Sequence, residues 1–201
     1  MQEQEVIKIL QEELNFPDQS IDKLKMFEGE ILKANKKYNF ISKSTENFIW
    51  SRHILDSAQI EKILPKQNKK YTTVDVGTGA GFPGLVLAAM GRSDLLLCEK
   101  SKKKNIFLNT VAKECNLNVK MYNDRIENLR ASNIRTVISR AFSPLKGLIL
   151  KVRHFLRYDT TLVLHKGRTH MQEIIEAKSL FCCSVLCSNM DLPCNSLSER
   201  E

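Results

Sequence analysis

A glycine-rich run between a short apolar strand and an apolar helix constrains the fold of this 201-residue chain more than any other feature. Residues 72–84 read TTVDVGTGAGFPG, and residues 85–90 continue as an apolar helix. Gly77, Gly79 and Gly81 let the backbone turn tightly, adopt positive φ and approach a ligand without a Cβ in the way. The run therefore predicts the nucleoside-binding turn of an α/β sheet.

Short β-rich runs separated by helical segments follow this turn. They lie at residues 72–76, 95–98, 118–122, 136–139 and 161–165, with 181–188 as a sixth. Parallel strands need a crossover of helix length, and right-handed crossovers dominate. This rhythm predicts the α/β class, with a Rossmann-like parallel sheet and helices on both of its faces.

The residues before the sheet have a helical rhythm instead. Apolar residues recur three and four positions apart up to about residue 64, and Asp18 or Ser20 is expected to cap the second helix. A polar, lysine-rich linker follows. We expect an N-terminal helical appendage at 1–66 and a cofactor-binding domain at 67–201.

Two acidic residues discriminate between the possible ligands of the turn. Its glycine spacing alone differs from the dinucleotide pattern G-x-G-x-x-G by a single residue. Asp75 lies inside the strand before the turn, where it can face the amino acid end of a cofactor. Glu99 ends the second strand, where a carboxylate accepts both ribose hydroxyls. These positions favour a methyltransferase over an NAD-linked dehydrogenase.

The charge balance favours a polyanionic partner. The formal net charge is +8, and such a surplus attracts nucleic acid by neutralising phosphates. No apolar run approaches the roughly 20 residues that span a bilayer. The first residues, MQEQEVIKIL, also lack the basic start and apolar run of a secretory signal. We expect a cytoplasmic protein without membrane contacts, and we favour a monomer.

The six cysteines predict neither disulfides nor a metal site. Without an export signal there is no oxidising compartment, so reduced thiols are expected. Four of the cysteines cluster at 182, 183, 187 and 194, but the spacing contains no C-x-x-C pair and no histidine. We therefore expect these thiols to pack in the fold and to hold no zinc.

Three segments resemble a known family. They are the turn DVGTGAGFPG, the segment Asn39-Phe-Ile-Ser42 followed by Trp50-Ser-Arg-His-Ile-Leu-Asp-Ser57, and the later Ser139-Arg-Ala141. They resemble the 16S ribosomal RNA guanine-N7 methyltransferases, also called glucose-inhibited division protein B. The likeness includes the Phe-Pro-Gly end of the turn, which generic methyltransferases lack. It implies a class I methyltransferase sheet, S-adenosyl-L-methionine as the methyl donor, and N7 of a guanine in the 16S ribosomal RNA of the small subunit as the acceptor.

The resemblance also implies roles for individual residues. It places Gly77 and Phe82 against the cofactor, Glu99 on its ribose, and Ile126 and Glu127 near its adenine. With these we group the turn residues Asp75, Gly79 and Gly81. Arg140 follows the fourth strand, at the edge where such sheets bind their ligands. We predict that Arg140 is the catalytic residue and contacts cofactor and RNA; the alternative is a surface salt bridge.

Two further polar residues are candidates for contact with RNA. Asn39 either touches the RNA or a flipped base, or caps a helix, since Asn tolerates the left-handed conformation. Lys103 best matches the family's lysine in the basic run 100–104 beside the turn. The alternative is a solvated helix start, although lysines there oppose the helix dipole and so invite an anion.

We do not expect the histidines to act as catalytic bases. N7 of guanine carries a lone pair and no proton, so its attack on a sulfonium methyl group needs no general base. His53 and Asp56 are spaced to share one helix face. We predict a structural or RNA-positioning role for His53, with its imidazole holding the helical part against the sheet. His165 and His170 have no partner at ligand spacing.

The end of the sequence departs from the family pattern. Family members finish with a sixth strand, a turn and an antiparallel seventh strand. Residues 191–200 resemble the loop before that last strand, which we expect to be missing here. Two other functions therefore stay open: a non-catalytic RNA-binding or ribosome-assembly protein that retains the fold, and a methyltransferase with another RNA or a protein as substrate.

Overall fold

A parallel sheet forms the centre of the computed structural model, which describes residues 1–167 and 169–179. Within these residues the sheet has five strands in the order β3-β2-β1-β4-β5. Their bounds are β1 Thr72–Val76, β2 Leu95–Cys98, β3 Lys120–Tyr122, β4 Ile134–Arg140 and β5 Thr161–His165. The predicted α/β sheet is confirmed. The strand order reverses between β1 and β4, which is the point where sheets of this kind bind their ligands.

Two strands have bounds that differ from the sequence prediction. β3 begins at Lys120 and not at 118, and β4 runs from Ile134 to Arg140 in place of 136–139, so Arg140 is the last residue of the strand and does not follow it. The extension has a physical reason, because Arg140 still pairs in register with His165 of β5. The predicted sixth strand at 181–188 and the loop at 191–200 lie outside the described residues.

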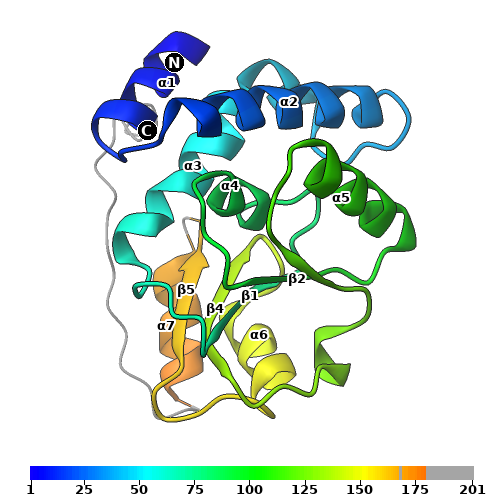
Figure 1. Cartoon of the computed structure of the whole chain (residues 1–201). Helices are drawn as coiled ribbons and strands as arrows, with labels where there is room; N and C mark the ends of the chain where they lie inside the picture. The colour runs from blue at the N-terminus through cyan, green and yellow to red at the C-terminus, as the bar shows by residue number, and fades with distance from the viewer. Residues whose placement is uncertain (168, 180–201) are drawn as a thin grey trace.

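Helices cover both faces of the sheet (Figure 1). On one face lie α4 (Gly84–Ala89) and α5 (Lys102–Glu114), together with the N-terminal helices. On the other face lie α6 (Leu145–Val152), α7 (His170–Lys178) and the 3₁₀ turn η4 (Ile126–Asn128). The burial of α4 follows from its position. All six of its residues are buried, since it lies between the sheet and the N-terminal helices.

The N-terminal part is helical, as predicted. Its elements are α1 (Glu3–Glu12), α2 (Asp18–Asn35), the 3₁₀ turn η1 (Lys43–Phe48), the π-helical turn η2 (Trp50–Leu55), α3 (Asp56–Ala58) and the 3₁₀ turn η3 (Gln59–Ile63). The predicted cap of the second helix is wrong. Pro17 occupies the N-cap position of α2, with φ −62°, and its carbonyl accepts from the Ser20 N–H at 2.8 Å. Asp18 and Ser20 are therefore already helical.

The N-terminal helices share a hydrophobic core with the sheet. Phe27 of α2, Ile54 of η2 and Leu85 of α4 belong to one buried cluster, in which each is at most 2% exposed. Burying one such side chain contributes about 1.5–3 kcal/mol. A second cluster, which contains Val74, lies under α6. The helical part is thus fixed against the strands, and the domain boundary at residue 66 stays a prediction.

Two further findings concern the cysteines and the length of the helices. Cys98 and Cys115 are buried free thiols, and burial raises their pKa to about 12 and about 11, so both stay protonated at neutral pH. The cluster at 182, 183, 187 and 194 lies outside the described residues. Among the residues that are described, no helix is both long enough and apolar enough to cross a membrane.

Candidate functional site

The glycine-rich turn lies at the carboxyl edge of β1, beside the point where the strand order reverses. Gly77, Gly79 and Gly81 have φ values of +69°, +62° and +102°, which residues with a Cβ rarely adopt. The Gly77 N–H donates to the Cys98 carbonyl at 2.9 Å, which fastens the turn to the end of β2. A Cβ added at Gly79 would have no neighbour closer than 3.8 Å. The backbone is therefore open to a ligand at that point.

Asp75 supports the turn from its buried side. It is fully buried, and its Oδ2 accepts from the Gly84 N–H at 2.9 Å. Burial, opposed in part by the hydrogen bond from the Gly84 amide, raises the pKa of Asp75 to about 7. A Cβ at Gly84 would lie 2.7 Å from the same oxygen, so the contact requires glycine there. Asp75 fixes the start of α4, and its contact with the amino acid end of a cofactor stays a prediction.

Glu99 follows β2 directly and is held by backbone amides. Its Oε2 accepts from the Gly79 N–H at 3.1 Å, and its Oε1 accepts from the Ser101 N–H at 2.8 Å. A carboxylate offers about four lone-pair positions, so each oxygen can accept a further hydrogen bond. The geometry suits a ligand with two adjacent hydroxyls lying across the turn, and the ribose contact stays a prediction.

Arg140 reaches from the end of β4 into the N-terminal helical part. Its Nη2 donates to the Arg52 carbonyl at 2.9 Å, and its Nη1 donates to the His53 carbonyl at 3.3 Å. Nη1 also lies 3.5 Å from Ser57 Oγ. These partners are backbone carbonyls of η2 and a hydroxyl, in place of the carboxylate that a surface salt bridge requires. The contacts predicted for Arg140 with cofactor, acceptor and RNA stay predictions.

His53 connects the glycine-rich turn to β4. Its imidazole stacks on the Phe82 ring, with centroids 4.9 Å apart and planes at 27°. Its Nδ1 lies 2.8 Å from Arg140 Nη2, and its Nε2 lies 2.9 Å from Thr45 Oγ1. Burial, and secondly the charge of Arg140, lower the pKa of His53 to about 4. The neutral ring therefore accepts from Arg140 and holds η2 against the sheet, as the sequence predicted.

Phe82 and His165 complete this buried contact. Phe82 is 7% exposed, and its ring centroid lies 5.1 Å from that of Phe27 in α2. The sequence left His165 without a partner, whereas the structure places it beside Arg140 and in a hydrogen bond with the backbone of Asp56. Burial, and secondly Arg140, lower the pKa of His165 to about 4. The cofactor contact of Phe82 stays a prediction.

Ile126 and Glu127 lie in η4, after the carboxyl end of β3. Ile126 is 2% exposed and belongs to the core under α6. The Glu127 side chain accepts from the Lys151 ammonium at 2.9 Å. Both residues lie beyond the same edge of the sheet as the turn, and their contact with an adenine stays a prediction.

Asn39 and Lys103, the residues besides Arg140 that are predicted to contact RNA, lie on neighbouring surface segments. Asn39 is exposed in the loop after α2, and the C-cap of that helix is Lys36, so the alternative of an Asn39 helix cap is wrong. Lys103 is exposed in the first turn of α5, and its Nζ lies 5.5 Å from the ring centroid of Tyr38. Their contact with RNA stays a prediction.

Phe142 is a residue of this edge that the sequence reasoning missed. A Cβ added at Gly77 would lie 2.2 Å from Cδ2 of Phe142, so the ring rests directly on the first glycine of the turn. The preceding Ala141 has a φ of +52°, which is uncommon for a residue other than glycine. The sequence signal that could have identified Phe142 was its position two residues after Arg140, just beyond the carboxyl end of β4.

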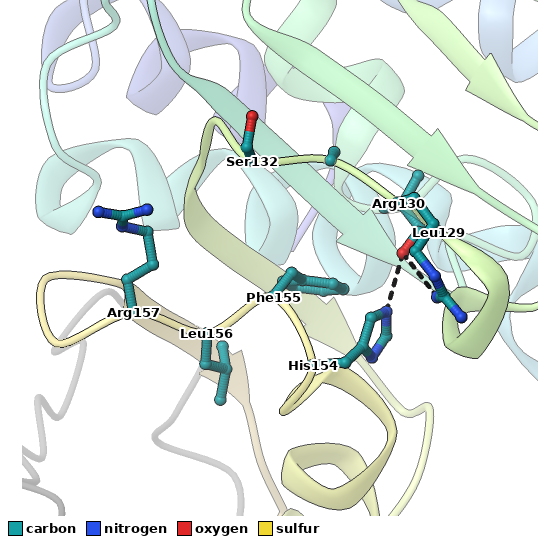
Figure 2. A pocket seen from close by; sticks show the side chains of 8 residues that line it. Leu129, Arg130, Ser132, His154, Phe155, Leu156 and Arg157 are labelled. Atoms are coloured by element: carbon teal, nitrogen blue, oxygen red, sulfur yellow. Dashed lines mark hydrogen bonds between the residues drawn. The ribbon is translucent and has the colours of Figure 1, made fainter.

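A hollow lies away from this edge (Figure 2). It has a volume of about 490 Å³ and is lined by residues 129–132 and 154–157. These segments precede β4 and β5, so the hollow lies toward the amino ends of the strands. His154 Nε2 lies 2.9 Å from the Leu129 carbonyl within it. None of the predicted site residues lines this hollow.

Comparison with known proteins identifies relatives over most of the chain. Residues 20–196 match the family described as rRNA small subunit methyltransferase G, GidB. "Ribosomal RNA small subunit methyltransferase G" of Rickettsia felis is 36% identical over 84% of this chain and 85% of that protein. The protein of the same name from Rickettsia bellii is 39% identical over 86% of this chain and 88% of its own. A solved ribosomal protein L11 methylase from Lactobacillus delbrueckii subsp. bulgaricus is 17% identical, with a TM-score of 0.49 over 63% of this chain and 64% of that one.

Proposed function

Since this chain belongs to the GidB family of rRNA small subunit methyltransferases G, it is an S-adenosylmethionine-dependent methyltransferase of 16S ribosomal RNA, and we propose that the acceptor is N7 of a guanine. One structural observation carries the assignment of the site. The glycine-rich turn, with its open backbone at Gly79 and the fixed carboxylate of Glu99, lies where the strand order reverses.

The residues present at this edge fit S-adenosylmethionine. Gly79 leaves the space that a Cβ would fill, and Glu99 keeps lone pairs for two hydroxyls. We propose that Glu99 holds the ribose and that Gly77, Gly79 and Gly81 line the path of the methionine part. Ile126 and Glu127 are proposed to flank the adenine, while Asp75 and Phe82 hold the turn in shape. When bound, the cofactor supplies an electrophilic methyl group on a sulfonium.

The protein's own contribution to the reaction is mainly positioning. N7 of guanine is a neutral nucleophile without a proton, so no residue has to act as a general base. The catalytic requirement is alignment of N7 with the methyl carbon and exclusion of water. The low pKa of His53 and His165, about 4 in each case, agrees with this, because burial makes both imidazoles weak bases.

Arg140 is proposed to act through η2. Its four hydrogen-bond partners belong to residues 52, 53 and 57, and they fix the backbone of the segment that faces the turn. This makes Arg140 a positioning residue, and a direct contact with the acceptor requires that some of these bonds exchange when RNA binds. Asn39 and Lys103 are proposed to contact the RNA outside the reaction centre.

The experiment that tests the function is methyl transfer from labelled S-adenosylmethionine to small ribosomal subunits that lack the modification. Label recovered as 7-methylguanosine after digestion of the 16S RNA is expected. Gly79→Asp places a carboxylate in the open space of the turn and is expected to abolish transfer and cofactor binding. Gly91→Asp is the matched control, since Gly91 also has positive φ and open space but lies away from the turn.

Other outcomes lead to the second candidate functions. A folded wild-type protein that binds subunits but takes up no S-adenosylmethionine would favour a non-catalytic assembly role. Label found in another RNA or in a ribosomal protein would identify a different substrate, and the methyltransferase assignment would still stand. We further propose a cytoplasmic location, which cell fractionation tests, and a monomeric state, which sedimentation tests.

A further inference from the structure

Two segments far apart in the sequence form one basic surface beside the turn. Residues 31–45, around the end of α2, contain four lysines and no acidic residue, and residues 100–113, in and before α5, contain five lysines and no acidic residue. Figure 1 shows α5 beneath the carboxyl end of α2. The two segments therefore meet where the loop after α2 lies against α5, and Lys37 and Lys103 approach the same ring there.

An aromatic stack joins the two segments. The Tyr38 ring stacks on Phe40, with centroids 5.4 Å apart and planes at 19°. Phe40 in turn packs against Phe107 of α5, with centroids 5.2 Å apart, and Phe107 is 8% exposed. The partly exposed Tyr38 is thereby anchored to the core, and the loop after α2 is fixed against α5.

Two ammonium groups lie over the Tyr38 ring. Lys37 Nζ is 5.1 Å from the ring centroid, and Lys103 Nζ is 5.5 Å from it. Cation–π attraction holds each ammonium at about this distance, although the two like charges repel each other. The single negative charge of a backbone phosphate bound by both would reduce this repulsion. We define Lys37, Tyr38 and Lys103 as the Tyr38 platform.

The basic surface continues from the Tyr38 platform to the reaction centre. The Nζ of Lys104, next to Lys103 in α5, lies 3.9 Å from the place of a Cβ on Gly79. An anionic chain lying over α5 therefore meets positive charge from the loop after α2 as far as the cofactor turn. A track of this kind suits a nucleic acid backbone, in which phosphates recur at regular intervals.

We propose that the Tyr38 platform binds a phosphate of the substrate RNA, with the ammonium groups of Lys37 and Lys103 as its two cationic contacts and Tyr38 as the residue that positions them. This inference rests on the proposed function, and it extends the RNA contact proposed for Lys103 to the whole Tyr38 platform. Asn39, which adjoins Tyr38 in the same exposed loop, lies within reach of the neighbouring nucleotide.

The test measures binding of a labelled 16S ribosomal RNA transcript as a function of salt concentration. Each phosphate contact contributes about 0.7–0.9 to the slope of log K against log salt. Lys37→Gln and Lys103→Gln are each expected to weaken binding and to lower the slope, and the double variant is expected to lower it by about 0.7–0.9, the amount for the one phosphate that the platform binds. The control is the double variant Lys69→Gln/Lys70→Gln, whose exposed lysines lie in the linker before β1. It is expected to keep the wild-type slope.

Variants of the ring separate positioning from simple packing. Tyr38→Phe keeps the π face and is expected to bind like wild type, whereas Tyr38→Leu keeps an apolar contact with Phe40 but loses cation–π attraction. A loss of about two- to fivefold in affinity is expected for Tyr38→Leu. Calorimetric titration with S-adenosylmethionine is expected to give the wild-type Kd for every variant.

The inference fails if the Lys37→Gln/Lys103→Gln variant keeps the wild-type slope, or if the linker control loses as much. In either case the proposed function still stands if the wild-type protein transfers a methyl group to the subunit. If the wild-type protein transfers no methyl group to the subunit, the proposed function itself has failed. The two failures are therefore distinguishable.

Discussion

The packing of Phe142 on Gly77 predicts that two glycines of one turn respond differently to the same substitution. Gly77 and Gly79 have nearly equal φ values of +69° and +62°. Alanine at either position adopts a left-handed conformation that costs about 1–2 kcal/mol, offset in part by the lower entropy of the unfolded chain. For Gly79→Ala we therefore expect a loss of about 1 kcal/mol, because its Cβ meets nothing within 3.8 Å.

Gly77→Ala carries a second cost. Its Cβ would lie 2.2 Å from Cδ2 and 3.1 Å from Cγ of Phe142, so a rotation of the ring tip alone does not relieve the contact. Overpacking of this kind costs about 1–3 kcal/mol, so the total expected loss is about 2–4 kcal/mol. In a Phe142→Ala background the contact is absent, and Gly77→Ala is expected to cost about 1 kcal/mol, like Gly79→Ala.

Urea denaturation of the four proteins of this double-mutant cycle, with Gly79→Ala as a reference, measures the coupling. We expect a coupling of about 1–3 kcal/mol between positions 77 and 142. Equal losses for Gly77→Ala and Gly79→Ala, or a cost of Gly77→Ala that does not change when Phe142 is removed, would refute the packing of Phe142 on the turn.

Three further predictions concern stability. Arg140→Ala removes the Arg140 donors to the Arg52 carbonyl and to His53 Nδ1, while the His53 carbonyl keeps the Asp56 N–H. The expected cost is about 1–3 kcal/mol. The fluorescence of Trp50, the single tryptophan, reports it during urea unfolding, and Arg140→Lys should fall in between. The pKa of His53 and of His165 is about 4 in the folded state, below the ordinary 6.5, so the unfolded chain binds more protons and stability should fall as pH drops from 6.5 toward 4. The raised pKa of Asp75, about 7, has the opposite sign, and Asp75→Asn should therefore make the loss toward acid steeper in urea titrations across this range. Gly29→Ala, inside α2 with nothing within 4 Å of the added Cβ, is expected to raise stability by about 0.5–1 kcal/mol, measured as a higher urea midpoint.

The sheet was predictable because its signals are local. Most of the strands are short runs rich in apolar or β-branched residues, and the glycine turn between residues 72–76 and α4 dictates where the first crossover begins. The cap of α2 was not predicted, since the fixed φ of Pro17 competed with the side-chain caps that Asp18 and Ser20 offer. Nor was the length of β4, which is set by pairing with a strand more than twenty residues away in the sequence.

The candidate site was predictable in part for the same reason. The turn and Glu99 are separated by one strand and one helix, so their meeting follows from the order of elements. The contact of Arg140 with His53 joins residues 87 positions apart, and Phe142 reaches Gly77 through a left-handed residue, Ala141. Neither contact has a periodic signal in the sequence, because the first depends on how η2 packs on the sheet and the second on the left-handed backbone at Ala141 after β4.

Methyl transfer from S-adenosylmethionine to unmodified small ribosomal subunits, followed by identification of the methylated nucleoside in the 16S RNA, tests the function and the cofactor site together. We expect 7-methylguanosine with the wild-type protein and with Gly91→Asp, and none with Gly79→Asp. Transfer that persists in Gly79→Asp, while that variant is folded, would contradict the assignment of the glycine-rich turn as the cofactor site.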